Sequence, residues 1–291
     1  MDFGSSGYTT KPTGISLRDR IQASQMEALK MSKIIVENLR KVYERQKEAD
    51  VIAIDKLSFT VEESEIVSIV GQTGCGKSTF LRILLGVDKP TSGRVLIDGK
   101  EPYKDFDYFR GRIAAVFQED RLLPWRTALD NVKLGLEILN IPRQEQLKKA
   151  AEWLDKLGLA GFHKAYPHEL SGGMRQRVAL ARALTLEPDI VLFDEAFGHL
   201  DEVTASRLRA DFLKVSKEQK YTTIMVTHNL DEAIESTNRI LVFGKPARIL
   251  ADIRIDEKHK RDIYSMYRMR EMIQNIIQRN EPAEVGEILD E

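Results

Sequence analysis

The stretch Gly71-Gln72-Thr73-Gly74-Cys75-Gly76-Lys77-Ser78-Thr79 decides the fold. An apolar, β-branched run at 66–70 precedes it and a helix-like run at 80–85 follows, which is the strand–loop–helix setting of the phosphate-binding motif G-x-x-x-x-G-K-S/T. Three glycines let the backbone curl so that several N–H groups point at one anion, and the next helix adds the positive end of its dipole. Lys77 supplies a charge for the β- and γ-phosphates and Ser78 a hydroxyl for Mg²⁺. We therefore expect phosphate binding here rather than a plain glycine turn.

Length and composition describe an ordinary globular protein. The chain has 291 residues, of which 42% are apolar and 31% charged, and a net charge of −1, so nothing predicts a nucleic-acid partner. Its one cysteine excludes an internal disulfide, which favours a reducing compartment. No stretch approaches the roughly 18 apolar residues of a spanning helix, and residues 1–11 lack the apolar core of a secretory signal. We therefore expect a cytosolic protein that reaches a membrane only through a partner.

The hydrophobic pattern changes along the chain from β-like runs to an alternation of strands and helices. Residues 1–13 resemble a flexible leader and 14–32 an exposed arm. Short strands are expected at 34–36, 41–43, 52–54 and 57–61, with a hairpin loop at 44–50. Further strands are expected at 65–70, 94–97, 113–117, 189–193, 222–227 and 239–243, with helices at 80–85, 128–160 (two, separated by Pro142), 174–186, 202–217 and 230–236. Such alternation predicts βαβ units, an α/β fold and a mainly parallel sheet.

Polar side chains follow three of these buried strands. Asp194 and Glu195 end the apolar run 189–193, Gln118 ends 113–117, and His228 follows 222–227. Ligands of open α/β sheets bind at the carboxyl ends of the strands, so these residues can face the phosphate loop. Asp194 can then help to hold Mg²⁺, and Glu195 can orient and deprotonate a water. The alternatives are two solvated acids in a turn and a structural glutamine and histidine.

A second anion site lies about 100 residues further along. Ser171-Gly172-Gly173 places a hydroxyl and two glycines at the start of the helix expected at 174–186. A single nucleotide does not need two such devices. Two nucleotides shared between two copies of the chain would use both.

With these motifs in order, residues 34–250 resemble the ATPase subunit of an ABC transporter. The resemblance assigns 71–79 as Walker A, Gln118 as the Q-loop, 170–176 as the signature with Met174 where glutamine is frequent, 190–195 as Walker B, 198–201 as the D-loop and His228 as the switch histidine. Tyr43 stands where an aromatic residue usually stacks on adenine, unless it is only a strand aromatic.

A finer resemblance points to the nitrate/sulfonate/taurine importer branch. Leu122-Leu123-Pro124-Trp125-Arg126-Thr127 and the segment 194–201 carry it, although Ala196 replaces a usual proline and His199 a usual alanine. Trp125 is then either a core anchor of the helical subdomain or part of a surface that faces the permease.

The resemblance implies a P-loop NTPase of ABC ATPase type, with an N-terminal antiparallel β subdomain and an inserted helical subdomain at about 121–176. It implies a domain at 34–250, flanked by extensions at 1–33 and 251–291. A head-to-tail homodimer would bind two ATP with Mg²⁺ between its subunits at the cytoplasmic face of a membrane. It would drive a permease to which a solute-binding protein delivers the solute, a small anion such as nitrate, an alkanesulfonate or taurine.

It also assigns roles by residue. Lys77, Gln118, Glu195 and His228 would be catalytic, with Glu195 as the base; Ser78, Gln118 and Asp194 would hold the metal. Tyr43 and residues Gly71, Gln72, Thr73, Gly74, Cys75, Gly76, Lys77, Ser78 and Thr79 would bind ATP, and Ser171, Gly172, Gly173 and Asp201 would bind the partner's ATP.

Three further expectations concern the thiol, the tail and the class of protein. Positive potential at the phosphate loop should favour the Cys75 thiolate, unless Cys75 is a small filler. The tail carries Ile263, Met266, Ile273, Ile276 and Ile277 near one helical face, which can pack on the core or on a second subunit, and 281–291 is acidic and expected to be loose. Rival readings are an ABC importer of another solute, a non-transport ABC ATPase of DNA repair, translation or cluster assembly, and a non-catalytic nucleotide-binding scaffold.

Overall fold

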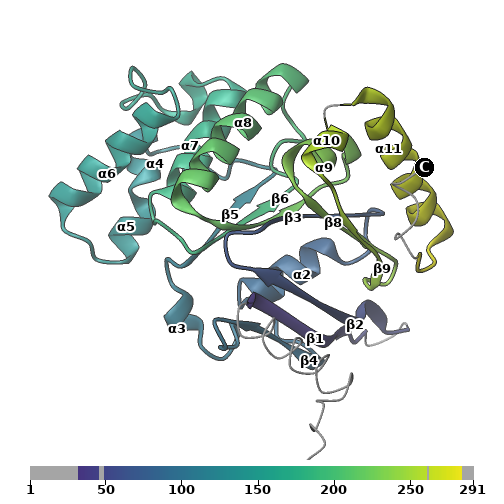
Figure 1. Ribbon diagram of the computed structural model, residues 1–291. Coiled ribbons are helices and arrows are strands. Elements are labelled where there is room, and N and C mark those ends of the chain that lie inside the picture. Colours follow the sequence, from purple (N-terminus) through teal and green to yellow (C-terminus); the bar gives the residue numbers. More distant parts are fainter. Residues whose placement is uncertain (1–31, 46–48, 261, 284–291) are drawn as a thin grey trace, which may run out of the picture.

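The computed structural model describes residues 32–45, 49–260 and 262–283, which form two sheets and the helices around them (Figure 1). The leader expected at 1–13, the arm at 14–32 except for its last residue, and most of the acidic end lie outside the described residues. One sheet has three strands in the order β2-β1-β4, and the other has six in the order β5-β6-β7-β3-β8-β9.

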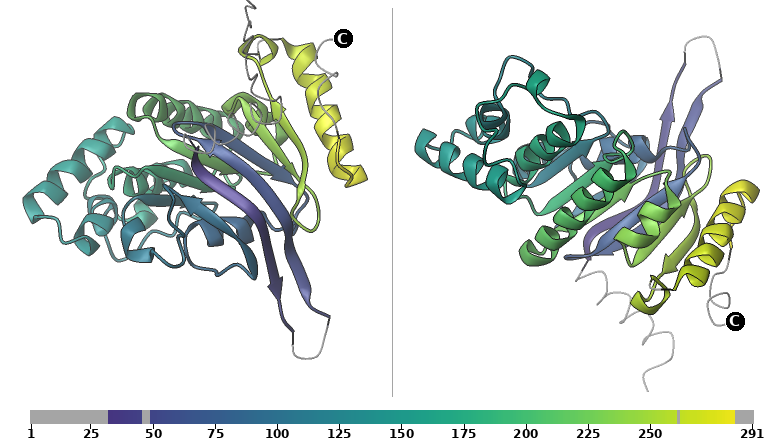
Figure 2. Two further views of the ribbon diagram at one scale, coloured as in Figure 1. Left: turned by 60° about the horizontal axis from the view of Figure 1, so that its bottom comes forward. Right: turned by 90° about the horizontal axis from the view of Figure 1, so that it is seen from above.

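The smaller sheet is the expected antiparallel subdomain. It consists of β1 (Ser32–Tyr43), β2 (Val51–Glu62) and β4 (Ser92–Ile97). The four short runs expected at 34–61 are two strands of 12 residues each, because irregularities such as the one between Val36 and Leu39 keep the pairing continuous past polar residues. The β1–β2 hairpin extends well beyond the rest of the sheet (Figure 2).

The larger sheet is mainly parallel. Its parallel strands are β3 (Ile66–Gly71), β5 (Ile113–Phe117), β6 (Ile190–Asp194), β7 (Thr222–Val226) and β8 (Arg239–Phe243). β9 (Ile249–Arg254) adds an antiparallel edge that the sequence pattern did not predict. This strand crosses residue 250, where we expected the ATPase domain to end, so the first residues of the expected C-terminal extension complete the sheet. Their pattern was missed because Leu250 and Ala251 are both buried, which breaks the alternation of a half-buried strand.

Helices cover both faces of the larger sheet. α2 (Lys77–Leu84) lies between it and the antiparallel sheet, while α7 (Gly172–Leu184), α8 (Glu202–Gln219) and α9 (Leu230–Ser236) cover the other face (Figures 1 and 2). α4 (Ala128–Val132), α5 (Leu134–Ile138) and α6 (Arg143–Lys156) form the lateral helical subdomain, so the region expected to hold two helices holds three. The shorter elements are α3 (Phe106–Phe109), the 3-10 turn η1 (Pro167–Glu169) and α10 (Glu257–Lys260).

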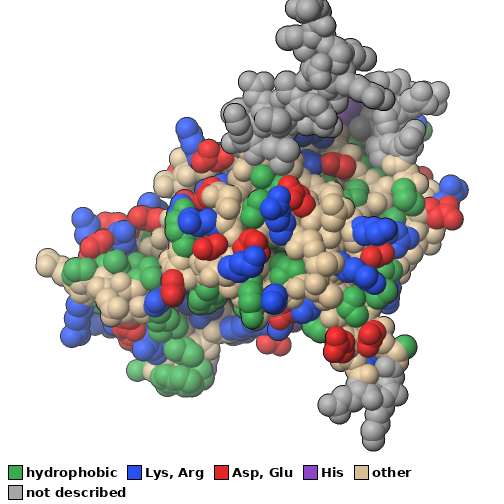
Figure 3. Space-filling model, turned by 90° about the horizontal axis from the view of Figure 1, so that it is seen from below, with side chains coloured by type: hydrophobic (Ala, Val, Ile, Leu, Met, Phe, Trp, Pro, Cys, Tyr) green, Lys and Arg blue, Asp and Glu red, His purple; other side chains and the backbone are tan. Residues whose placement is uncertain are grey.

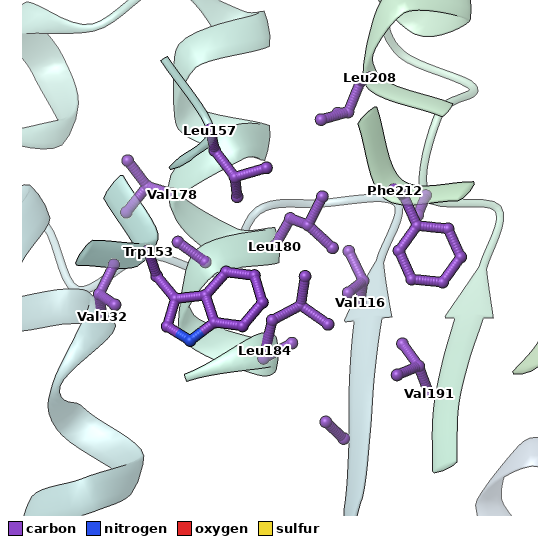
Figure 4. Close-up of a cluster of buried hydrophobic side chains, with 14 of the residues drawn as sticks. Val116, Val132, Trp153, Leu157, Val178, Leu180, Leu184, Val191, Leu208 and Phe212 are labelled. Carbon is purple, nitrogen blue, oxygen red and sulfur yellow. The ribbon is translucent and has the colours of Figure 1, made fainter. Parts of the chain in front are cut away.

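A tryptophan anchors the helical subdomain, but it is Trp153 rather than Trp125. Trp153 is 5% exposed and packs in one cluster with Val178 and Leu184 of α7, and Phe212 of α8 belongs to the same cluster (Figure 4). Trp125 is 71% exposed, so its reading as a core anchor is wrong.

The tail helix α11 (Ile263–Arg279) packs on its own chain. Met269, Ile273 and Ile276 are buried in a cluster with residues of α9, β8 and β9. Ile263, expected on the same face, is 85% exposed because it stands in the first turn, beyond the reach of that cluster. The packing option on the chain's own core is therefore the one observed.

The surface shows no large region of one charge on the face seen from below (Figure 3). Lys and Arg side chains alternate there with Asp and Glu, which agrees with the net charge of −1. Among the described helices, none is long and apolar enough to span a bilayer.

Candidate functional site

Glycines at both ends of the phosphate loop allow it to fit between two strands. A β-carbon on Gly71 would lie 2.6 Å from the carbonyl oxygen of Phe243, and one on Gly76 would lie 2.3 Å from that of Ala53. Gly76 also has φ 115°, which a side chain rarely adopts. Both glycines are thus required by close backbone approach, and α2 begins directly after Gly76.

The Lys77 side chain folds back over its own loop. Its ammonium donates to the carbonyl oxygens of Gly71 at 2.7 Å and Gln72 at 3.1 Å, and the residue is 5% exposed. The Gln72 side chain points the other way, with Nε2 donating to the carbonyl oxygen of Ile277 at 3.0 Å. This contact between the phosphate loop and the tail helix was not expected from the sequence.

Ser78 and Asp194 meet at the expected metal position. The Ser78 hydroxyl donates to Asp194 Oδ1 at 3.2 Å. Burial raises the pKa of Asp194, the nearby charge of Glu195 raises it further, and the hydrogen bond from Ser78 opposes both. A hydroxyl beside a carboxylate is an oxygen donor set of the kind that Mg²⁺ prefers, so these residues fit the ion.

Glu195 and His228 lie side by side. His228 Nδ1 is 3.1 Å from Glu195 Oε2, and the Glu195 N–H donates to the carbonyl oxygen of Val226 at 2.9 Å. Glu195 has φ 51°, a left-handed conformation that costs a non-glycine residue about 1–3 kcal/mol. Glu195 adopts this conformation directly after β6, whose neighbour β7 precedes the histidine.

Gln118 contacts a residue to which we assigned no function. Its Nε2 lies 3.0 Å from His199 Nε2, and both residues line a hollow of about 370 Å³ that also includes Gly172. The two side chains thus form a hydrogen-bonded pair beside the start of α7. The metal-binding role expected for Gln118 stays a prediction.

The signature segment starts α7 as expected. The Ser171 hydroxyl accepts from the Met174 N–H at 3.3 Å and caps the helix, and Gly173 has no room for a β-carbon, which would lie 2.5 Å from Thr204 Cγ2. Asp201 caps α8 in the same way, accepting from the Thr204 N–H at 3.0 Å, and this backbone bond lowers its pKa. In the described part of the chain, no hydrogen bond joins Ser171 to the phosphate loop.

Sequence reasoning missed the buried amide of Gln176. Its Nε2 donates to the carbonyl oxygens of Phe117 at 2.9 Å and Ala196 at 2.7 Å, which joins the signature helix to the segments that carry Gln118 and Glu195. Gln176 is 4% exposed. A glutamine among the apolar positions of α7 was the signal that could have revealed it.

Tyr43 is held by an ion pair at the end of α2. Its hydroxyl donates to Asp88 Oδ2 at 2.7 Å, and Arg82 donates two hydrogen bonds to the same carboxylate at 3.0 and 2.9 Å. The Arg82 guanidinium lowers the pKa of Asp88 to about 2. Tyr43 is 37% exposed, Lys41 Nζ lies over its ring at 4.8 Å from the centroid, and the contact of this ring with adenine stays a prediction.

The expectation of a Cys75 thiolate is wrong. Cys75 is 1% exposed and belongs to the apolar cluster around Phe80 and Ile69. Burial raises the pKa of the thiol, and the nearby charge of Lys77 opposes this without cancelling it. Cys75 is thus the small filler of the alternative reading.

The phosphate loop is flanked by an antiparallel sheet and a helical subdomain, and an acid pair and a histidine lie at the neighbouring strand ends. This combination defines a cassette-type P-loop ATPase. A profile described as "ABC transporter" matches residues 54–198. An uncharacterized ABC transporter ATP-binding protein of Methanocaldococcus jannaschii is 44% identical over 248 residues, covering 84% of this chain and 91% of that protein. The chain belongs to the ABC transporter family of ATP-binding proteins.

Other relatives differ in what their names say they import. An aliphatic sulfonates import ATP-binding protein of Bacillus cereus is 40% identical over 67% of this chain and 76% of its own length. A glycine betaine/carnitine transport ATP-binding protein of Listeria monocytogenes is also 40% identical, over 76% of this chain and 64% of its own length. The family is thus shown and the importer branch is not.

Solved structures confirm the fold and the ATPase class. A dimeric structure of an ABC transporter cassette superposes with a TM-score of 0.69 at 34% identity, covering 77% of this chain and 99% of that one. A second structure is titled as a post-hydrolysis state bound to ADP and Pi, with a TM-score of 0.69 at 33% identity and the same coverage. The expected α/β cassette with its mixed, mostly parallel sheet and antiparallel subdomain is confirmed.

Proposed function

We propose that two copies of this chain close on two ATP molecules and that hydrolysis drives a membrane permease of an importer. One observation carries the proposal: Ser171–Gly173 forms a second glycine-rich helix start, exposed at Ser171 and Gly172, whose hydrogen bonds do not reach the phosphate loop of the same chain. The dimeric state of the similar cassette supports it. Each ATP then lies between the phosphate loop of one copy and Ser171, Gly172, Gly173 and Asp201 of the other.

Each residue near the phosphates has one task in this proposal. Lys77 leaves its two carbonyl partners and binds the β- and γ-phosphates. Ser78 and Asp194, with Gln118, hold Mg²⁺, which when bound neutralises charge on the phosphates. Tyr43 stacks on adenine, and the backbone of residues 71–79 binds the phosphate oxygens.

Glu195 and His228 act on the attacking water. The water oxygen bonds to the γ-phosphorus, the bond to the ADP oxygen breaks, and Glu195 takes the proton of the water. His228, 3.1 Å from that carboxylate, keeps it oriented and contacts the γ-phosphate. ADP and phosphate no longer join the two copies, so the dimer opens.

The permease would contact the surface that follows Gln118. Trp125 presents a large apolar side chain there with 71% of its area exposed. Exposed tryptophans are enriched at the centres of protein interfaces. The chain would then act as a peripheral subunit at the cytoplasmic face of the membrane, with a solute-binding protein delivering the solute.

The transported solute is proposed to be a small anion such as nitrate, an alkanesulfonate or taurine. The segment Leu122–Thr127 and the sulfonate import relatives support this class. Relatives named for betaine and for iron import are equally similar, so importers of other small solutes remain the first alternative. A non-transport ABC ATPase is the second.

A mixing experiment tests the shared site. Lys77→Ala should remove the phosphate charge from one half-site, and Ser171→Arg should block the other half. Each variant alone should be inactive, whereas an equimolar mixture should regain ATPase activity because the mixed dimer holds one intact site. If both halves acted within one copy, the mixture would stay inactive.

A purification experiment tests the transport part. The chain would be expressed with the membrane proteins of its source cells and isolated through an affinity tag. Recovery of a stoichiometric permease supports a transport role, and radiolabelled sulfonate uptake by that complex in vesicles supports the solute class. Recovery of the ATPase with no membrane protein would favour the non-transport alternative.

A further inference from the structure

The turn between β8 and β9, residues 244–248, forms one wall of the phosphate loop. Phe243, at the end of β8, approaches Gly71 so closely that a β-carbon there would lie 2.6 Å from its carbonyl oxygen. A β-carbon on Gly76 would lie 2.9 Å from Cβ of Ala247. The end of β8 and the turn that follows it therefore contact the two ends of the phosphate loop.

This turn carries an unpaired lysine. Lys245 Nζ lies 3.7 Å from the position that a β-carbon on Gly74 would occupy. Lys245 is exposed and makes no ion pair with any residue of the described ranges. Its charge and that of Lys77 both act on Cys75, against the effect of burial on the thiol pKa. Two lysines thus lie at one anion-binding loop.

The backbone of Lys245 is fixed by the end of the tail helix. Asn280 follows α11 with φ 54°, and its side-chain Oδ1 accepts from the Lys245 N–H at 2.8 Å while its Nδ2 donates to the Lys245 carbonyl oxygen at 3.1 Å. Arg248 donates to the Asn280 carbonyl oxygen at 2.7 Å. On the other side of the turn, the Ala247 N–H donates to the Ala53 carbonyl oxygen at 3.0 Å. The backbone of Lys245 is thus hydrogen-bonded, whereas its side chain is exposed.

The same turn of α11 touches the phosphate loop directly. Gln72 Nε2 donates to the carbonyl oxygen of Ile277, one turn before Asn280. α11 itself is anchored by its buried face on β8 and β9, beside which it lies in Figure 1. The end of α11 is therefore a rigid support for both Gln72 and the backbone of Lys245.

We propose that Lys245 is a second lysine that binds the phosphates of ATP, and that Asn280 positions it. The ligand is the polyphosphate chain that the phosphate loop holds, so the inference rests on ATP binding at that loop. A flexible ammonium without a carboxylate partner, next to the loop, gains most by pairing with the anion when it arrives. A fixed backbone lowers the entropy lost on pairing.

Calorimetric titration of ATP and ADP tests the lysine. Lys245→Gln should weaken ATP binding about 5- to 20-fold and ADP binding less, and Lys245→Arg should keep most of the affinity because it keeps the charge. The loss should shrink at about 0.5 M salt, where an exposed pair is screened. Lys217→Gln is the matched control, because Lys217 lines a hollow with Glu65 and Ile66 at the opposite end of β3.

The outcomes separate this role from general failure. If Lys245→Gln binds ATP within about twofold of the wild type, or if the Lys217 control loses as much affinity, the lysine proposal is overturned. If the wild-type chain itself does not bind ATP, the function proposed above fails first. Lys245→Arg reports on folding. If Lys245→Gln and Lys245→Arg both lose ATP affinity and both have a lowered melting temperature, the substitutions damage the structure and the proposal is contradicted.

A double-mutant cycle tests Asn280. Asn280→Gly keeps the left-handed backbone and removes the amide that holds Lys245. It should weaken ATP binding in the wild-type background and have little further effect in Lys245→Gln. Equal losses in both backgrounds would show that Asn280 does not act through Lys245.

Discussion

The carboxylate of Glu195 and the imidazole of His228 lie 3.1 Å apart, although 32 residues of chain separate them. β6 and β7 are neighbouring parallel strands, so the residues that follow them meet at one edge of the sheet. Glu195, the first residue after β6, has a left-handed backbone with φ 51°. Sheet order thus brings into contact the carboxylate and the imidazole that we propose as the base and its orienting group.

Glu195→Gln should therefore separate binding from hydrolysis. Glutamine keeps the size and the polar contact but cannot take a proton, so turnover should fall about 10²- to 10⁴-fold while ATP still binds. Without hydrolysis, ATP should hold two copies together. Gel filtration with ATP should show a dimer, and a monomer with near-normal ATPase activity would contradict the assignment.

Asp194→Asn should stabilise the nucleotide-free protein and abolish Mg²⁺-dependent ATPase activity. Burial raises the pKa of this carboxyl, so its charged form is disfavoured in the folded state and stability is lost as pH rises above the unfolded pKa of about 4. The neutral amide avoids that loss, so the melting temperature should rise by about 1–3 °C at pH 7 and the gain should vanish below about pH 4.

The matched control lies at the other end of the same strand. Asp189 accepts from Arg112 at 2.6 Å, so Asp189→Asn removes an ion pair and should leave stability unchanged or lower it. Its ATPase activity should be retained. A lower melting temperature for Asp194→Asn at pH 7 would refute the burial argument.

Asp88→Asn should weaken ATP binding through Tyr43. Losing the charged acceptor frees the tyrosine hydroxyl and the Arg82 side chain, and affinity should fall about 2- to 10-fold. Tyr43→Phe removes only the hydroxyl, so it should lower the affinity for ATP by less than Tyr43→Ala does. Calorimetry of the three variants checks the order, and an unchanged affinity for Tyr43→Ala would remove Tyr43 from the site.

The same substitution has a defined pH signature in the absence of nucleotide. The pKa of Asp88 is lowered to about 2 in the folded state, so its ion pair stabilises the fold above the unfolded pKa near 4 and this contribution is lost as pH falls toward 2. Wild type should exceed Asp88→Asn in urea resistance at pH 7, and the difference should narrow below about pH 4. A difference that grows with acidity would have the wrong sign.

The motifs were predictable from sequence because each one is local. Residues 71–79, 171–173 and 190–195 carry their chemistry within one turn and its flanking elements, so their spacing indicated phosphate-binding sites and an acid pair. The resemblance of these motifs to ABC ATPases then predicted a cassette ATPase, which the fold and the relatives confirm. Likewise, the strand at 239–243 could be predicted because the four residues that follow Arg239 are all apolar.

Contacts between distant segments were not predictable. The pairing of Gln118 with His199, the position of Asn280 beside Lys245 and the bonds of Gln176 each join residues that are 20 or more positions apart. The exposure of Trp125 and the burial of Cys75 are decided in the same way, by which surfaces the tertiary fold covers. Neither the periodicity of apolar residues nor the charge pattern of the sequence indicates which surfaces the fold covers.

Cys75 should resist alkylation in the folded protein. Its raised pKa keeps the thiol protonated and its 1% exposure keeps reagents away, so a maleimide should label it slowly with or without ATP and rapidly only in urea. Because the chain has one cysteine, Cys75→Ser gives a background of zero. If the folded protein were labelled rapidly and ATP prevented this labelling, the interpretation of Cys75 as a thiolate would be restored.

Substituting the two tryptophans should separate partner binding from stability. Trp125 is 71% exposed, so Trp125→Ala should change the free energy of unfolding by no more than about 0.5 kcal/mol and leave ATPase activity of the isolated subunit intact. Trp153 is 5% exposed, so Trp153→Ala should cost about 3–5 kcal/mol. Urea unfolding measures both, and recovery of the permease with each tagged variant measures docking. Trp125→Ala should lower the recovery of the permease without lowering the stability of the subunit. Undiminished recovery of the permease would exclude Trp125 from the docking surface.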